Sequence, residues 1–494
     1  MKVFNLRYII LFSIIIFFLG CEDKVISENK KPYEGKTIMV IAPTLNADLI
    51  RGPILKNKKE FEEKTGARVR VVTPNWTETI KSIDKSIAPN SNIIYDIYVV
   101  IGLWNGTLLS SGKNIAPLPS WVKDKLDWDD VLPIYKNNIL TWNNTSYGIP
   151  YDGDNISLYY RKDIFEDRAN QTKFLKKYGY NLDVPKTWKQ YIDIAKFFNG
   201  WDWDNDGKVE HGNAGLRIKG DVSLLQFFAF AGAYSKCPKD KSYYFDKDTM
   251  KARIANDGFV RSLEEYIELI KYGPKGMKNF AGHDVRDAFI KGEVAMAIDW
   301  TDLGITAANS PYSIVANKIG YAQLPGADET FNCKTKTWKK SYNAPSSISG
   351  NWTLFVSEKS LNKKLAFEFA SFIGSKEKTK GYIVDPSSGI NPSRYSHLKD
   401  ALSWQKAGFS NESAQEYINT IEKSLENKNV IVDIMIPGGA QYYEVLDGLV
   451  FDAIEGKYTA KEALELASKE WEKITDSLGR ERQKRFYRES LNIK

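Results

Sequence analysis

The chain has 494 residues, including 13 Trp, 27 Tyr and 24 Phe but only 3 His and 3 Cys. At about 100–200 residues per domain, this length predicts two or three packed units, and the 43% apolar content can supply their cores. So few His and Cys residues exclude a zinc ribbon, an iron–sulfur cluster or a disulfide framework. The 69 basic and 62 acidic side chains give a net charge of +7, a balance that argues against both a disordered chain and a dedicated nucleic-acid binder.

The N-terminus has the pattern of a secretory signal. Lys2 and Arg7 precede an apolar run over residues 8–19, which is too short to cross a membrane. The junction Gly20-Cys21 resembles a bacterial lipobox, in which the cysteine is lipidated; the alternative is an ordinary cysteine near a cleavage site. We expect residues 1–20 to be a lipoprotein signal peptide and residues 21–36 a polar tether. The mature protein is then exported and anchored to the bacterial cell membrane through Cys21.

The other two cysteines, Cys237 and Cys333, have two open fates. Outside the cytoplasm they could form a disulfide, or they could stay as two buried thiols. The sequence carries no information on the distance between them, so both fates remain open.

Strands and helices alternate in the first hundred residues. Residues 67–72 alternate apolar and polar side chains with a period of two, which predicts a strand with one polar face. The helix before this strand is closed by Gly66. The predicted elements are strand 37–42, helix 54–64, strand 67–72, helix 76–86 and strand 95–101. This order predicts a doubly wound α/β lobe, which places ligands at the carboxyl ends of its strands, here residues 102–106.

Later segments carry apolar stripes at helical spacing. Trp188 lies on the apolar side of a helix that begins after Thr187. Thr459 and Glu462 form a capping box, and the helix that follows turns Trp471 inward. Two more helices are predicted over residues 365–372 and 414–425. We therefore expect Trp188 and Trp471 to be core residues.

One polar segment has the spacing of a calcium-binding loop. In an EF-hand loop, oxygen ligands come from alternate positions, and a glycine at position six allows a sharp turn. Gly207 stands at that position, whereas Asn213 replaces the glutamate of position twelve. The predicted ligands are Asp202, Asp204, Asp206, the carbonyl group of Lys208, and Glu210. We expect one structural Ca²⁺ ion here; the alternative is a metal-free turn rich in aspartate.

Eight segments occur in the order found in one protein family. Among them are Val184-Pro-Lys-Thr-Trp188 and Phe289-Ile-Lys-Gly-Glu-Val-Ala-Met296. The full set is residues 147–151, 158–163, 184–188, 289–296, 319–326, 349–352, 366–372 and 456–464. Over residues 37–478 the chain thus resembles the extracellular solute-binding proteins of ABC importers, typified by maltose-binding protein.

The resemblance implies an α/β fold of two doubly wound lobes. Crossover strands join the lobes, as in periplasmic binding proteins of type II, and the lobes close on a ligand by hinge motion. One lobe would comprise residues 37–149 and 318–390, and the other residues 150–317 and 391–494.

The resemblance also implies a set of ligand-binding residues. Sugars present apolar faces and rings of hydroxyl groups, so their sites combine flat aromatic surfaces with acids or amides. The candidates at positions where the family contacts its ligands are Trp104, Asn105, Tyr151, Asp152, Asp154, Asp299, Trp300, Asp302, Trp352, Tyr442 and Tyr443. The alternatives are surface aromatic residues and, for Tyr151 to Asp154, a solvated turn.

The function implied is that of a lipid-anchored, monomeric receptor. It would capture a sugar or oligosaccharide and deliver it to the membrane subunits of an ABC permease, without a role for nucleic acid. One alternative is a binding protein for a phosphorylated polyol or another anion, which would need cationic groups in the cleft; Arg161 and Arg217 are candidates. The other is a secreted glycosidase with two carboxylates. No nucleophile and base pattern surrounds the three histidines, so we expect a binding protein and not an enzyme.

Overall fold

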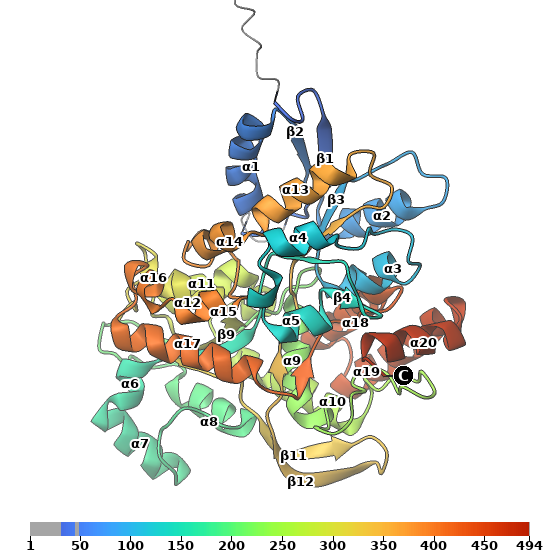
Figure 1. Cartoon of the computed structure of the whole chain (residues 1–494). Helices are drawn as coiled ribbons and strands as arrows, with labels where there is room; N and C mark the ends of the chain where they lie inside the picture. Colours follow the sequence, from blue (N-terminus) through green and yellow to red (C-terminus); the bar gives the residue numbers. More distant parts are fainter. Residues whose placement is uncertain (1–30, 45–48, 494) are drawn as a thin grey trace, which may run out of the picture.

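The computed structural model describes residues 31–44 and 49–493 (Figure 1). The predicted signal peptide, Cys21 and the tether up to residue 30 lie outside these residues. Within the described part of the chain, no helix combines the length and the apolar character that a membrane span needs.

The first sheet has five strands. Their order is β2 (Arg68–Val72), β1 (Thr37–Ile41), β3 (Ile97–Val100), β14 (Thr353–Val356) and β6 (Ile149–Pro150). Strand β1 runs parallel to β2 and β3, whereas β14 is antiparallel to β3 and β6. The predicted order of strands and helices at the start of the chain is confirmed.

Local sequence explains the two helices between these strands. Helix α1 (Gly52–Thr65) ends at Gly66, whose φ of 76° is left-handed and lets its amide donate to the carbonyl oxygen of Glu62. Helix α2 (Trp76–Ile87) begins with a capping box between Asn75 and Glu78. These ends fix where the chain turns back to the sheet.

The second sheet has four strands. Their order is β10 (Ile319–Ala322), β7 (Ile156–Arg161), β9 (Val294–Trp300) and β8 (His211–Ala214). Strand β7 is antiparallel to β10 and β9, and β8 is parallel to β9. Because β10 pairs with β7, the chain rejoins the first sheet only at β14, which begins at Thr353, well after the predicted return to the first lobe at residue 318.

Two later helices bury their predicted apolar sides. Thr187 and Gln190 form a capping box at the start of α8 (Trp188–Phe198), and Thr459 and Glu462 form one before α19 (Ala460–Ser477). Trp188 and Trp471 are buried core residues, as predicted. The remaining elements are α3 (Asn105–Leu109), α4 (Ser120–Lys125), α5 (Pro133–Asn138), β4 (Thr141–Trp142), β5 (Thr145–Ser146), α6 (Lys162–Glu166), α7 (Arg168–Tyr178), α9 (Ser223–Ser235), α10 (Asp257–Glu268), α11 (Gly282–Ile290), α12 (Asp302–Asn309), β11 (Ala327–Asn332), β12 (Thr337–Asn343), β13 (Ser346–Ser347), α13 (Lys363–Ile373), α14 (Lys376–Tyr382), α15 (Tyr395–Lys399), α16 (Ala401–Lys406), α17 (Asn411–Leu425), β15 (Val430–Ile431), α18 (Gly439–Ile454) and α20 (Arg480–Ser490).

Three segments meet where the chain passes between the two sheets. The amide of Asp152, which follows β6, donates to the carbonyl oxygen of Trp352 at 3.2 Å. A third segment packs against the first, because a Cβ atom on Gly153 would lie 2.1 Å from the carbonyl oxygen of Pro392. Residues distant in sequence are thereby held side by side at the junction of the lobes.

Replacement of Gly212 tests how tightly β8 packs against α8. A Cβ atom at this position would lie 1.8 Å from the carbonyl oxygen of Ala195, so the backbone has to shift. We expect Gly212→Ala to lower the free energy of unfolding by about 2 kcal/mol or more, measured by denaturant titration. Gly381→Ala is the matched control, because a Cβ atom there meets nothing within 4 Å in a helix that favours alanine. Equal stability of the two variants would contradict the close packing of β8.

Candidate functional site

A cavity lies between the two sheets. Its walls leave about 480 Å³ of space free of protein atoms, a volume that includes open solvent. Its walls come from the predicted candidates Asp154, Asp299, Trp300, Asp302 and Trp352, together with Leu49, Ile50, Val222, Gly282, Arg286, Gly350 and Gly389. Five of the eleven residues predicted to bind ligand are thus brought together in one place.

Arg286 on α11 neutralises two of these acids. Its Nε lies 2.9 Å from an oxygen of Asp299, and its Nη1 lies 2.6 Å from an oxygen of Asp302. Burial raises the pKa of Asp299 to about 6, and the charge of Arg286 opposes that rise. The sequence interpretation missed Arg286, although its position three residues before the matched segment at Phe289 could have drawn attention to it.

Asp152 and Asp154 form a second acidic pair, held by Asn391. The backbone amide of Asn391 donates to Asp152 Oδ1 at 2.7 Å, and its side-chain amide donates to Asp154 Oδ1 at 2.6 Å. Thr301 donates to the Asn391 side-chain oxygen at 2.6 Å, which fixes the orientation of the amide. Asn391 was also missed, because its Gly-Ile-Asn-Pro context does not mark a ligand site.

Burial favours the protonated forms of this pair. Burial is the main reason why the pKa of Asp152 is raised to about 7. Burial and the charge of Asp152 hold the pKa of Asp154 well above its usual range. A protonated carboxyl group donates a hydrogen bond and an ionised one accepts it, so Asp154 can pair with a ligand hydroxyl group in either protonation state. Asp154 lines the cavity, whereas Asp152 lies behind it.

Two tryptophans form flat walls of the cavity. Trp300 ends β9 and is 6% exposed, and its indole N–H donates to the carbonyl oxygen of Ser349 at 2.9 Å. Trp352 comes directly before β14 in the other sheet and is 4% exposed. Tyr151 stands behind the wall, where its hydroxyl group donates to the carbonyl oxygen of Ile50 at 2.5 Å. The fixed rings suit the apolar face of a small ligand.

The other four candidates do not line this cavity. Trp104 is buried against Trp76, with ring centroids 4.9 Å apart, and Trp76 also contacts Tyr443. The amide of Asn105 donates to a backbone carbonyl oxygen at 3.0 Å. Tyr442 packs on Trp471 and shares a hydrogen bond with a threonine hydroxyl group. The predicted ligand contacts at these positions are not supported, because the side chains are used in packing.

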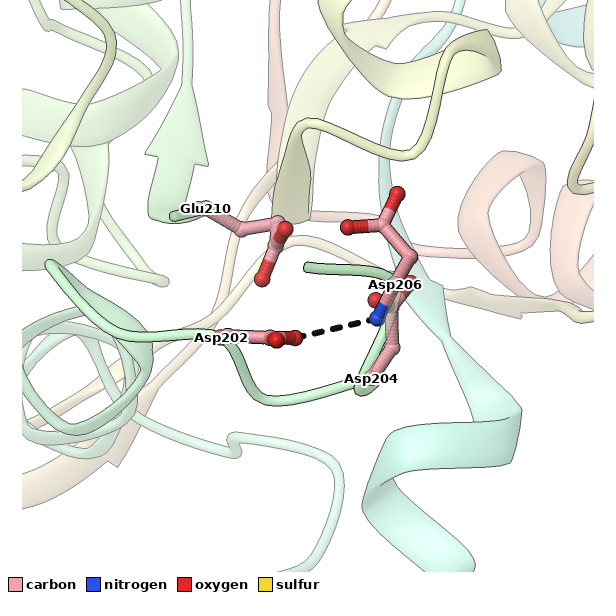
Figure 2. A group of neighbouring side chains, drawn as sticks. All are labelled: Asp202, Asp204, Asp206 and Glu210. Carbon is pink, nitrogen blue, oxygen red and sulfur yellow. Dashed lines mark hydrogen bonds between the residues drawn. The ribbon is translucent and has the colours of Figure 1, made fainter. Parts of the chain in front are cut away.

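The predicted calcium loop folds its acids around one point (Figure 2). Carboxylate oxygens of Asp202, Asp204, Asp206 and Glu210 all lie within 4.8 Å of one another. Glu210 is only 4% exposed, and its Oε2 accepts a hydrogen bond from the amide of Trp203. Its buried Oε1, like Oδ1 of Asp204, has no hydrogen-bond partner. Two buried acceptors without donors are what a bound cation would satisfy.

Backbone geometry explains how the loop closes. Gly207 has a φ of 88°, a conformation that glycine adopts without strain. The amides of Asp206 and Gly207 donate to the carboxylate of Asp202 at 3.1 and 3.0 Å. Asn213 lies in β8 and donates to the carbonyl oxygen of Leu269, so it takes no part in the acidic cluster.

Replacing Arg286 tests the electrostatic balance of the cavity. We expect Arg286→Met to lower the free energy of unfolding by about 3–5 kcal/mol near neutral pH, because two buried carboxylates lose their partner. The pKa of Asp299, already raised to about 6, then rises further, so the deficit shrinks toward about pH 5, where Asp299 takes up a proton. Denaturant titrations near neutral pH and at about pH 5 measure this deficit in the free energy of unfolding.

Lys278→Met provides the matched control. Lys278 pairs with Glu455 at 2.8 Å, but its side chain is 47% exposed, so its loss costs at most about 1 kcal/mol. A deficit of Arg286→Met that is equally small, or that grows as the pH falls, would contradict the proposed balance.

The model of the bacterial extracellular solute-binding protein family matches residues 56–411. The mannitol-binding protein of Pseudomonas aeruginosa is 22% identical over 359 residues, which are 72% of this chain and 73% of that protein.

Solved structures agree on the fold. A solute-binding protein of an ABC transporter from Agrobacterium radiobacter, in complex with ribitol, has a TM-score of 0.70 at 20% identity and covers 90% of this chain and 100% of its own. Maltose-bound MalE3 of T. maritima has a TM-score of 0.67 at 19% identity, covering 89% and 99%. A solute-binding protein of Agrobacterium vitis with bound D-mannitol has a TM-score of 0.66 at 19% identity, covering 90% and 99%. The chain belongs to the bacterial extracellular solute-binding proteins, the exported receptors of ABC importers.

Proposed function

We propose that this receptor binds a neutral sugar or polyol in the cavity between its lobes. The observation that carries the proposal is a cavity lined by three acids, Asp154, Asp299 and Asp302, and by the side chains of two tryptophans. Hydroxyl groups both donate and accept hydrogen bonds, so they can pair with carboxyl groups in either protonation state. Relatives with bound mannitol, ribitol and maltose support this ligand class.

An anionic ligand is disfavoured because the candidate arginine side chains already have partners within the protein. Arg286 already pairs with Asp299 and Asp302. Arg161, predicted as a candidate, pairs with Asp163 and Asp204 at the end of β7. Arg217 lies over the ring of Tyr266 and does not line the cavity. A phosphate group would therefore meet carboxyl groups without a free positive charge to hold it.

A glycosidase is also disfavoured by the geometry. That chemistry needs one carboxyl group poised as an acid and a second as a free nucleophile or base. Here Asp299 and Asp302 are held by a guanidinium group, and Asn391 holds the other pair. The family and the similar structures are likewise binding proteins of transporters.

Delivery completes the proposed function. The chain would be exported, lipidated at Cys21 and held at the membrane by the lipid, where it passes its ligand to the membrane subunits of an ABC permease as a monomer. The lipobox-like junction supports the anchor, and family membership supports the permease as partner.

Titration with a defined panel tests the ligand class. We expect saturable binding of one neutral compound among D-mannitol, ribitol, D-tagatose and maltose, measured by calorimetry, and no binding of mannitol 1-phosphate. Trp300→Ala should weaken binding by about 1–3 kcal/mol, because the ligand loses an aromatic face. Trp121→Ala is the control, since Trp121 packs on Phe367 away from the cavity. Preference for the phosphorylated compound, or recovery of a shortened sugar, would contradict the proposal.

We also propose that the loop over residues 202–210 binds one structural Ca²⁺ ion. Four carboxylates converge there, and the buried Oε1 of Glu210 and Oδ1 of Asp204 lack donors. The carbonyl group of Lys208 would be a fifth ligand. The ion would supply no chemistry to the cavity; it would brace the segment between α8 and β8, where Arg161 also reaches Asp204 at 3.3 Å.

Thermal unfolding with and without metal tests this site. We expect CaCl₂ to raise the melting temperature, because a ligand bound only by the folded state stabilises it by about 2.7 kcal/mol at 100 times its Kd. Mg²⁺ should act less, since it demands octahedral geometry. Glu210→Gln should remove most of the Ca²⁺ effect, whereas Asp248→Asn, at an exposed acid, should retain it. No Ca²⁺ effect on the unsubstituted protein would overturn this proposal.

A further inference from the structure

The fold brings together two cysteines that are 96 residues apart in the sequence. Cys237 comes just after α9, and Cys333 comes just after β11, at the turn of the β11–β12 hairpin. The hairpin lies at the lower edge of the molecule in Figure 1, below α9 and α10. Both residues are partly exposed thiols in the structure.

Their contacts show how close they lie. The thiol of Cys237 donates to the carbonyl oxygen of Phe331, two residues before Cys333, with the sulfur 3.6 Å from that oxygen. The Sγ of Cys333 accepts from the side-chain amide of Asn256 at 3.5 Å. These contacts bring both thiols to the place where the end of α9 meets the end of β11.

We propose that Cys237 and Cys333 form a structural disulfide in the exported protein. Membership of the extracellular solute-binding family places the chain outside the cytoplasm, where disulfides persist. The oxidant is the disulfide of an exported dithiol oxidoreductase. A thiolate of this pair attacks that disulfide and forms a mixed disulfide; the second cysteine then attacks the sulfur of the first, which releases the oxidoreductase as a dithiol. Both cysteines are oxidised, and the two electrons and two protons pass to the oxidoreductase.

The surroundings of the thiols favour a lasting bond over a reactive switch. Burial raises the pKa of both thiols, that of Cys333 to about 11, although Arg253 opposes the rise. Thiolates are therefore not stabilised in the reduced form, and a dithiol of this kind yields a disulfide that is hard to reduce. Cys333 lines a surface pocket, which gives an oxidant access to it.

The bond would fasten the hairpin to α9. Asn343, at the end of β12, already donates to the carbonyl oxygens of Ala233 at 2.9 Å and Lys236 at 3.0 Å. The disulfide closes the long loop of chain between Cys237 and Cys333. A closed loop of this length removes much conformational entropy from the unfolded state. It therefore holds the hairpin at the point where the chain returns toward the first sheet.

Peptide mapping tests the bond itself. The full chain is exported, purified without reductant, alkylated in denaturant and cleaved with trypsin. We expect residues 237–239 and 319–334 to be recovered as one linked species that separates on reduction. Recovery of both peptides unlinked and alkylated would overturn the proposal.

Thermal unfolding tests its structural role. We expect a reductant to lower the melting temperature of the unsubstituted protein by several degrees. The double variant Cys237→Ser with Cys333→Ser should melt like the reduced protein and ignore the reductant, which separates loss of the disulfide from other effects of the reagent. If the linked species is lost on reduction but the melting temperature stays the same, the bond has no structural role.

Discussion

Burial of acids at the junction of the two lobes is the constraint on which the site depends. An ionised carboxylate that leaves water pays several kcal/mol unless a partner compensates it. Arg286 compensates Asp299 and Asp302, and Asn391 holds Asp152 and Asp154, whose pKa values rise so that the proton relieves the charge. An acidic cavity is thereby kept close to neutral inside the protein.

The two tryptophans of the cavity relate the fold to ligand binding. Trp300 belongs to the sheet of β9 and Trp352 leads into β14 of the other sheet, so a ligand between the rings touches both lobes. Contacts made only when the lobes are together favour the closed arrangement, which is how a hinge receptor couples capture to closure. A neutral ligand with several hydroxyl groups gains these contacts without disturbing the ion pairs of Arg286.

The sequence predicted features that depend on neighbouring residues. The first strands and helices, the Gly66 helix end, the capping boxes at Thr187 and Thr459, and the core positions of Trp188 and Trp471 all follow from local patterns. The acidic loop was found by spacing alone, because its oxygen atoms come from one short segment.

The sequence could not reveal contacts between distant segments. Arg286 and Asn391 matter because of what packs against them, and neither has a distinguishing local pattern. Trp104 and Tyr443 were predicted to bind ligand from their places in the chain, yet their rings pack with Trp76. The proximity of Cys237 and Cys333 likewise exists only in three dimensions.

A crystal structure of the protein grown with the neutral compound that binds tightest is the most direct measurement. The account predicts one ligand between Trp300 and Trp352, with a hydroxyl group hydrogen-bonded to Asp154 and with Arg286 still paired to Asp299 and Asp302. A ligand bound outside this cavity, or an anion bound directly to Arg286 with its acid partners displaced, would contradict it.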